Sequence, residues 1–202
     1  MTDPVFHFQP PLQTSRRNLL KIATLVEGGM LLAALGLGWL LEEPWWTGAR
    51  ADVVSLATGA VAGAVMLAAA GAFMELNLPF TIQMRRDIDR LSGLFRDATL
   101  LDFLYISLLA GAGEEALFRG LVQTGMAAHL GLPLAIAASA LIFGLVHNIS
   151  RPYVVFTAVL GVFFSGLFVW SDNIVVPATA HGAYDFIALC YMRHGTAKNR
   201  KD

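Results

Sequence analysis

Charged residues are scarce in this sequence of 202 residues, because Asp, Glu, Lys and Arg together make up 14% of it. Soluble domains carry about 25% charged residues. Apolar residues reach 56%, and the mean hydropathy is +0.60. This composition excludes an ordinary soluble domain and indicates a membrane protein.

Excess basic charge is also absent, since 14 basic residues face 15 acidic ones. Without a net positive field, nucleic acid is excluded as a partner. Cysteine is nearly absent, and the one cysteine, Cys190, cannot form an internal disulfide. Internal repeats and low-complexity linkers are lacking as well, so the simplest division is a single membrane domain over residues 1–202.

Long apolar runs, in contrast, are abundant. A helix needs about 18–20 residues to cross roughly 30 Å of hydrocarbon. Six segments meet this requirement, namely residues 18–41, 53–74, 100–127, 131–148, 153–170 and 174–192. The sequence therefore predicts an all-α, polytopic membrane helical bundle of about six transmembrane helices. In the second segment, Gly59 and Gly63 are expected to allow close helix approach.

The connection at residues 75–99 mixes charged and apolar residues in the pattern of an amphipathic helix on the membrane surface. With the N-terminus in the cytoplasm, Arg50 is the one basic residue of the outer connections, and Arg119 lies within a span. The inner side then holds Arg16, Arg17, Lys21, Arg85, Arg86, Arg90, Arg96, Arg151, Arg193, Lys198, Arg200 and Lys201. The positive-inside rule thus predicts a multi-pass protein of the cell inner membrane with cytoplasmic tails at residues 1–17 and 193–202.

Arg16 and Arg17 ahead of an apolar run resemble a twin-arginine export signal, whose cleavage would leave five spans. A convincing small-residue cleavage site does not follow the run. Because the charges alternate correctly with the segment retained, we expect it to remain.

Three of the predicted spans contain ionisable residues, which are costly in hydrocarbon and mark functional sites. They are Gly113-Glu114-Glu115-Ala116-Leu117-Phe118-Arg119, Phe143-Gly144-Leu145-Val146-His147 and His181-Gly182-Ala183-Tyr184-Asp185. Such groups offset one another only by converging on one water-accessible pocket. The alternative is a structural polar knot in which each histidine hydrogen-bonds a backbone carbonyl.

Helical spacing assigns provisional partners to these residues. Glu115 and Arg119 are four residues apart, share a helix face and can form an ion pair. Glu114 points about 100° away from its neighbour, which leaves its carboxylate free to act as a general base. His181 and Asp185, also four residues apart, can meet so that the carboxylate orients the imidazole.

The ordered trio Glu-Glu-x-x-x-Arg, Phe-x-x-x-His and His-x-x-x-Asp on separate membrane helices resembles the CPBP family of CAAX prenyl proteases and bacteriocin-processing (Abi) enzymes. The resemblance covers about residues 100–190. Members are regarded as intramembrane glutamic endopeptidases, so it implies hydrolysis of a peptide bond in a membrane-associated protein or peptide. The catalytic core would be residues 100–192, after two N-terminal spans within residues 18–74.

The resemblance also implies roles for individual residues. Glu114 would be the base that activates water, and His147 would hold that water. Glu115 and Arg119 would hold the first glutamate and the substrate region in place. Phe143 is expected to pack beneath His147.

His181 and Asp185 would support the oxyanion, with one departure from the family pattern. The prenyl-protease branch usually has asparagine at the position of Asp185. An asparagine amide can donate a hydrogen bond to an oxyanion, whereas an ionised aspartate cannot. We therefore expect Asp185 to act indirectly, by stabilising a protonated His181.

Three other functions are compatible with the same residues. Glu114, His147 and His181 could ligate zinc, although the zincin signature His-Glu-x-x-His is absent, and no cofactor is expected. A proton-coupled transporter is an alternative, but the two halves show no repeat pairing. The third is an inactive scaffold or immunity protein, against which the retained Glu114, His147 and His181 argue.

The depths of these residues impose a geometric condition. Glu114 lies roughly 20 Å along its helix from Leu100, whereas His147 lies near the inner end of its own span. They can meet only if the third helix begins below the surface, tilts, or breaks at Gly111 and Gly113. We expect a cavity that opens toward the cytoplasmic side.

Two ionisable residues fall outside the motifs. Glu27, near the middle of the first span, is expected either to reach the same pocket, toward Arg119, or to stay protonated against neighbouring helices. Asp102 is expected to be solvated, because it lies close to the inner interface.

Overall fold

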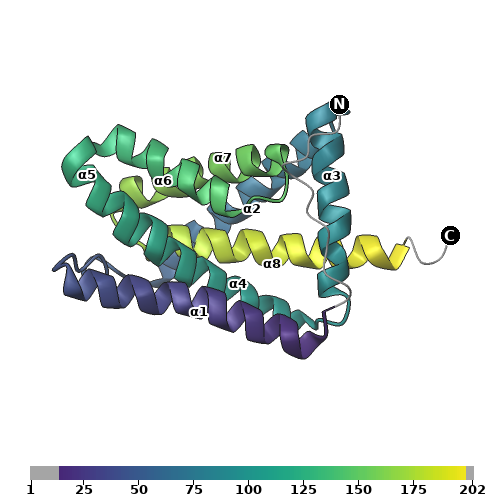
Figure 1. Ribbon diagram of the computed structural model, residues 1–202, viewed down its shortest axis with the longest axis horizontal. Helices are drawn as coiled ribbons and strands as arrows, with labels where there is room; N and C mark the ends of the chain where they lie inside the picture. Colours follow the sequence, from purple (N-terminus) through teal and green to yellow (C-terminus); the bar gives the residue numbers. More distant parts are fainter. Residues whose placement is uncertain (1–13, 199–202) are drawn as a thin grey trace.

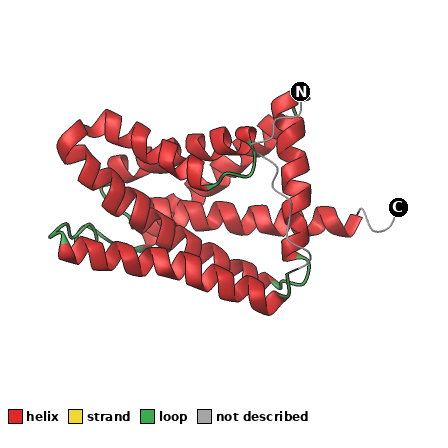
Figure 2. Ribbon diagram, viewed as in Figure 1, coloured by secondary structure: helices red, strands yellow, loops and turns green. Residues whose placement is uncertain are grey.

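The computed structural model describes residues 14–198, so residues 1–13 and 199–202 of the two predicted tails lie outside it. The described chain is a bundle of helices without strands, which confirms the predicted all-α bundle (Figures 1 and 2). Its helices are α1 (Arg16–Leu40), α2 (Val53–Met74), α3 (Pro79–Ser92), α4 (Leu100–Glu115), α5 (Thr124–Leu130), α6 (Leu132–Val146), α7 (Arg151–Ser171) and α8 (Val175–Lys198). A 3₁₀ turn (Gly93–Phe95) follows α3, and a π-helical segment (Ala116–Gln123) joins α4 to α5.

Short polar side chains mark where four of the helices begin. A side-chain oxygen of each accepts a hydrogen bond from a backbone N–H of the first turn, which satisfies a donor that has no partner within the helix. These residues are Ser15, Asp52, Thr99 and Ser150. Gly131, with φ of +76°, provides the left-handed turn that separates α5 from α6.

Three helices are long and apolar enough to cross a membrane: α1, α2 and α7, with 25, 22 and 21 residues. They confirm three of the predicted spans. Helix α6 is apolar but has 15 residues, a length of about 22 Å. The third predicted span is α4 continued by the π-helical segment and α5, and the sixth is α8, which carries the ionisable motif. The total of six crossings stays a prediction.

The helix ends expected on the inner side lie together at one end of the bundle. Arg16, at the start of α1, binds Asp102 near the start of α4 through two hydrogen bonds of 2.6 and 2.8 Å. The Ser150 hydroxyl, at the start of α7, donates to Asp87 of α3. Helices α1, α4 and α7 thus all start at the end that α3 crosses (Figure 1), as the predicted alternation requires.

The expectation that Asp102 is solvated is wrong, because its side chain is 6% exposed. The backbone N–H and the hydroxyl of Thr99 donate to it, as does Arg16. Such a carboxylate is tolerated away from water because its oxygens are satisfied by charge-assisted hydrogen bonds. The position of Asp102 near the end of its predicted span did not reveal this burial, because its partner Arg16 lies 86 residues earlier in the sequence.

Helix α3 confirms the helix expected within residues 75–99, and it covers the end of the bundle. Its charged residues Arg86, Asp89 and Arg90 are exposed. Its other face packs against α2, α7 and α8, with Met84 buried and Ile88 facing the interior cavity. The amphipathic pattern therefore serves, at least in part, to close the bundle.

Glycines set the spacing between the central helices. A Cβ added to Gly63 would clash with the backbone carbonyl of Ala180, and one added to Gly59 would lie 2.6 Å from Thr179. These contacts between α2 and α8 confirm the close approach expected from the two glycines.

Of the three alternatives for the third predicted span, a break at Gly111 and Gly113 is not observed. Helix α4 is continuous through both residues, which instead contact neighbouring backbones: Gly111 faces Ala178 of α8, and Gly113 faces the carbonyl of Glu27. Helix α4 runs obliquely to α8 (Figure 1), and the tilt and depth of α4 in a membrane stay predictions.

We predict that Gly111→Ala destabilises the protein by about 1–3 kcal/mol, because the added methyl group overpacks the α4–α8 contact. The midpoint of SDS-induced unfolding in mixed micelles measures the change. Gly36→Ala is the matched control, since a Cβ at Gly36 would meet nothing within 4 Å. Equal midpoints for the two variants would contradict the prediction.

Candidate active site

The motif residues of the three predicted spans lie in one place. Glu114 and Glu115 end α4, and His147 directly follows α6. His181 and Asp185 come from the middle of α8. The π-helical segment places Arg119 beside them, and such segments often occur at functional sites. The convergence on which the sequence argument depends is thus present.

Glu115 is the centre of a buried ionic network. Its Oε1 accepts a hydrogen bond of 2.8 Å from Nη1 of Arg119, and both side chains are 0% exposed. The same oxygen accepts a 2.9 Å hydrogen bond from Nδ1 of His181. Nη2 of Arg119 donates to the backbone carbonyl of Gly161 in α7. The network therefore ties α4, α7 and α8 together.

Aromatic rings enclose this network. The Arg119 guanidinium lies 4.5 Å from the ring centroid of Phe143 and 5.5 Å from that of Phe164, so it makes cation–π contacts with both. Phe164 also stacks on His181 at 4.7 Å, and Phe143 lies 4.7 Å from His147. The rings shield the ion pair from water, and Phe164 packs on the face of the His181 imidazole.

Glu114 faces both histidines. Its Oε2 lies 3.6 Å from Nε2 of His147 and 4.0 Å from Nε2 of His181. Nδ1 of His147 is 2.7 Å from the carbonyl oxygen of Phe143, and since a carbonyl can only accept, this nitrogen carries the proton. In neutral His147, Nε2 is consequently a hydrogen-bond acceptor directed at the Glu114 side.

The carboxylate that orients His181 differs from the one expected. Spacing along the helix suggests Asp185, but its Oδ2 lies 3.5 Å from Nε2, whereas Glu115 binds Nδ1 at 2.9 Å. Glu115 therefore sets the orientation of the ring. Nε2 of His181 is left facing Glu114 and Asp185, in the direction of the cavity.

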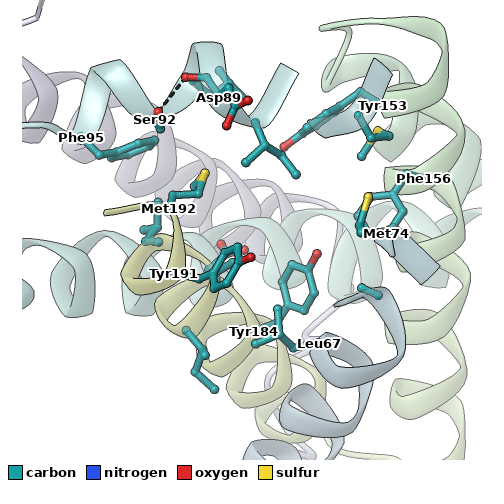
Figure 3. A pocket seen from close by; sticks show the side chains of 18 of the residues that line it. Leu67, Met74, Asp89, Ser92, Phe95, Tyr153, Phe156, Tyr184, Tyr191 and Met192 are labelled. Carbon is teal, nitrogen blue, oxygen red and sulfur yellow. Dashed lines mark hydrogen bonds between the residues drawn. The ribbon is translucent and has the colours of Figure 1, made fainter. Parts of the chain in front are cut away.

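A cavity of about 1160 Å³ extends from these residues toward α3. Glu27, Glu114 and Asp185 line it together with apolar and aromatic side chains from α2, α3, α7 and α8. Figure 3 shows the tyrosines and methionines that line it: Met74, Tyr153, Tyr184, Tyr191 and Met192. The cavity reaches the end of the bundle predicted to face the cytoplasm, as expected.

The structure adds residues that the motifs do not contain. Phe164 and Gly161 belong to α7, which has no Asp, Glu, His or Lys and no Arg after Arg151, so nothing in its sequence indicated a contact with Arg119. Glu27 lines the cavity and was recognisable as an ionisable residue in an apolar span. Its place in the cavity that Glu114 lines, rather than beside Arg119, was not.

The donor geometry gives no support for zinc. Among residues 14–198, no group of three His, Cys, Asp or Glu side chains is arranged to hold a metal ion. Of the three ligands considered from the sequence, Glu114 lies 3.6 Å from His147 and 4.0 Å from His181.

In this helical bundle, a carboxylate that lines the cavity faces two histidines, and such a set of groups can activate water. Residues 96–187 match the family model described as type II CAAX prenyl endopeptidase Rce1-like. The matched segment contains all three motifs, so the match confirms the resemblance to the CAAX prenyl proteases. It supports a CAAX-protease-like peptidase function in the membrane at the level of the family.

One curated relative is the uncharacterized protein YpbD of Bacillus subtilis (strain 168), 33% identical over 103 residues. The aligned region is 50% of this chain and 50% of YpbD, so the chain spans about half the length of that relative. No solved structure matches the chain.

We predict that Arg119→Met destabilises the protein by about 3–5 kcal/mol, because it leaves the Glu115 carboxylate buried without its cation. Adding Glu115→Gln should recover part of the loss, since the amide removes the charge and its oxygen can still accept from His181. SDS unfolding midpoints of wild type and both variants measure this. A double variant less stable than Arg119→Met would contradict the ion-pair interpretation.

Proposed function

We propose that the chain is an intramembrane endopeptidase that hydrolyses a peptide bond of a membrane-associated protein or peptide, with water activated by Glu114. The observation that supports this proposal best is the position of the Glu114 carboxylate, which faces Nε2 of both His147 and His181 beside the cavity. No cofactor is needed in this proposal, because the side chains supply both base and donor.

The nucleophilic water lies between Glu114 and His147. The 3.6 Å between Oε2 and Nε2 is too long for a direct hydrogen bond, and both atoms accept hydrogen bonds from a water beside them. Among the described residues, Oε2 of Glu114 is buried without a hydrogen-bond partner, as expected of an atom that binds this water. Glu114 takes one proton as the water oxygen attacks the peptide carbonyl.

His181 stabilises the oxyanion that forms. With Nδ1 bound to Glu115 and Nε2 directed toward Asp185, a doubly protonated ring is flanked by two carboxylates and can donate Nε2–H to the oxyanion. Glu114 then returns its proton to the leaving amine, which breaks the C–N bond. The products are a carboxylic acid and an amine, and Glu114 is ionised again.

The chemistry of the cavity suggests the class of substrate. Its walls combine apolar and aromatic side chains with the rim residues Arg85, Asp89 and Arg96, which suits a peptide that emerges from a bilayer. We propose a membrane-anchored peptide, bacteriocin precursor or sorting-signal protein as substrate. The lipid bilayer is the second partner, and we propose the cell inner membrane with both chain ends in the cytoplasm.

We predict that Glu114→Gln abolishes cleavage without loss of folding, because the amide cannot accept the proton of water. Membrane proteomes of cells carrying wild type or Glu114→Gln should differ in a peptide terminus found only with wild type. SDS unfolding midpoints of the two proteins control for folding.

Other outcomes of that comparison favour other functions. Wild-type protein that cleaves nothing over a broad peptide panel would favour an inactive scaffold. Cleavage that is lost on dialysis against a chelator and restored by zinc would favour metal catalysis.

We predict that Asp185→Asn retains much of the activity, since Asp185 acts through His181 and an asparagine amide can itself donate to the oxyanion. His181→Ala should instead lower kcat by about 10²–10³-fold, the usual cost of losing an oxyanion donor. Rates on one cleaved peptide compare the two variants. A loss with Asp185→Asn as complete as with Glu114→Gln would rule out this indirect role.

A further inference from the structure

Glu27 is an ionisable residue that the motifs and the matched family segment leave out. It lies on α1, outside residues 96–187, in the middle of a helix apolar enough to cross a membrane. A carboxyl group at such a depth costs several kcal/mol on insertion, so it usually has a function. Glu27 lines the same cavity as Glu114 and Asp185.

The packing of α1 on α4 places Glu27 beside Glu114. Arg16 binds Asp102, and eleven residues further along each helix, Glu27 meets Gly113. The two helices are therefore parallel and in register over this length. At Gly113 any side chain would clash with the carbonyl of Glu27, so the glycine lets the two backbones touch one residue before Glu114.

The Glu27 backbone meets the residue that precedes Glu114, and the side chains of Glu27 and Glu114 line the same cavity, so their carboxyl groups enter one space. Oε2 of each is buried and has no hydrogen-bond partner from the described part of the chain. Two ionised carboxylates in contact repel, and neither can donate. The contact becomes attractive when one of them carries a proton and donates it to the other.

We propose that Glu27 is a positioning residue of the active site, whose carboxylic acid donates a hydrogen bond to the Glu114 carboxylate and holds it toward His147 and His181. This inference rests on the function proposed above. The two acids then have different roles: Glu27 fixes the direction of the base, whereas Glu114 exchanges protons with water and the leaving amine. The Glu114 carboxylate is then positioned by a hydrogen bond from α1 as well as by its own attachment to α4.

Two substitutions of Glu27 separate positioning from other roles. Glu27→Leu removes the donor and should lower kcat by about 10²-fold, the order of loss expected for a misplaced catalytic group. KM should stay unchanged, because the lost interaction does not bind substrate. Glu27→Gln keeps a donor in the same position and should retain most of the activity.

Thr24→Val is the matched control, since Thr24 lies one turn before Glu27 on α1 and also bonds α4, through the hydroxyl of Tyr105. This variant should cleave as wild type does. All proteins should keep near-wild-type SDS unfolding midpoints, and Glu27→Gln should lose a carboxylic C=O band from the infrared spectrum that wild type shows.

The results distinguish a failure of this inference from a failure of the proposed function. Full activity of Glu27→Leu with an inactive Glu114→Gln would overturn the role of Glu27 and leave the peptidase intact. Glu27→Gln as inactive as Glu27→Leu would also overturn it, because a donor would then not suffice. If Glu114→Gln cleaves as wild type does, the peptidase mechanism fails, while an infrared band unchanged in Glu27→Gln would independently refute a protonated Glu27.

Discussion

The buried carboxylate of Glu115 is the group on which the rest of the site depends. An unpaired charge in a low-dielectric interior costs far more than folding can supply, so it must be paired and hydrogen-bonded. One oxygen of Glu115 binds both Arg119 and His181, and Arg119 in turn binds a carbonyl of α7. Three helices are thereby fixed relative to one another, and His181 acquires a defined orientation.

This pairing explains why two adjacent glutamates have different roles. Oε1 of the fully buried Glu115 accepts from both Arg119 and His181, and Glu115 does not line the cavity, so it is not placed to activate water. Glu114 points away from Arg119 into the cavity, where two imidazoles face it without closing on it. The rings of Phe143 and Phe164 lie against the guanidinium and help to enclose the ion pair. One helix end thus presents a carboxylate held in an ion pair and a second carboxylate that lines the cavity.

Sequence periodicity located the long apolar helices and one ion pair between residues four apart. The apolar runs located α1, α2 and α7, and the spacing of Glu115 and Arg119 predicted their ion pair. Contacts between different helices could not be predicted from spacing within one helix. The orienting partner of His181 is Glu115, 66 residues away, rather than Asp185 at four residues, because tilt and depth decide which side chains meet. Phe164 carries no charge that could have marked it as a site residue. The burial of Asp102 was missed because its partner, Arg16, comes from another helix, α1.

The N-terminal helices complete a site whose motifs all lie elsewhere. The family match begins at residue 96, yet α1 contributes Arg16 to Asp102, and the Glu27 backbone meets Gly113. The α1–α2 connection contributes Trp45, against which Gly120 of the π-helical segment packs. Helix α2 packs on α8 through Gly59 and Gly63 and lines the cavity from the opposite side. Residues 96–187 therefore hold the groups proposed to react, whereas the preceding helices build part of the wall around them. Such a wall lowers the local dielectric, and in a low-dielectric site hydrogen-bond donors stabilise an oxyanion most strongly.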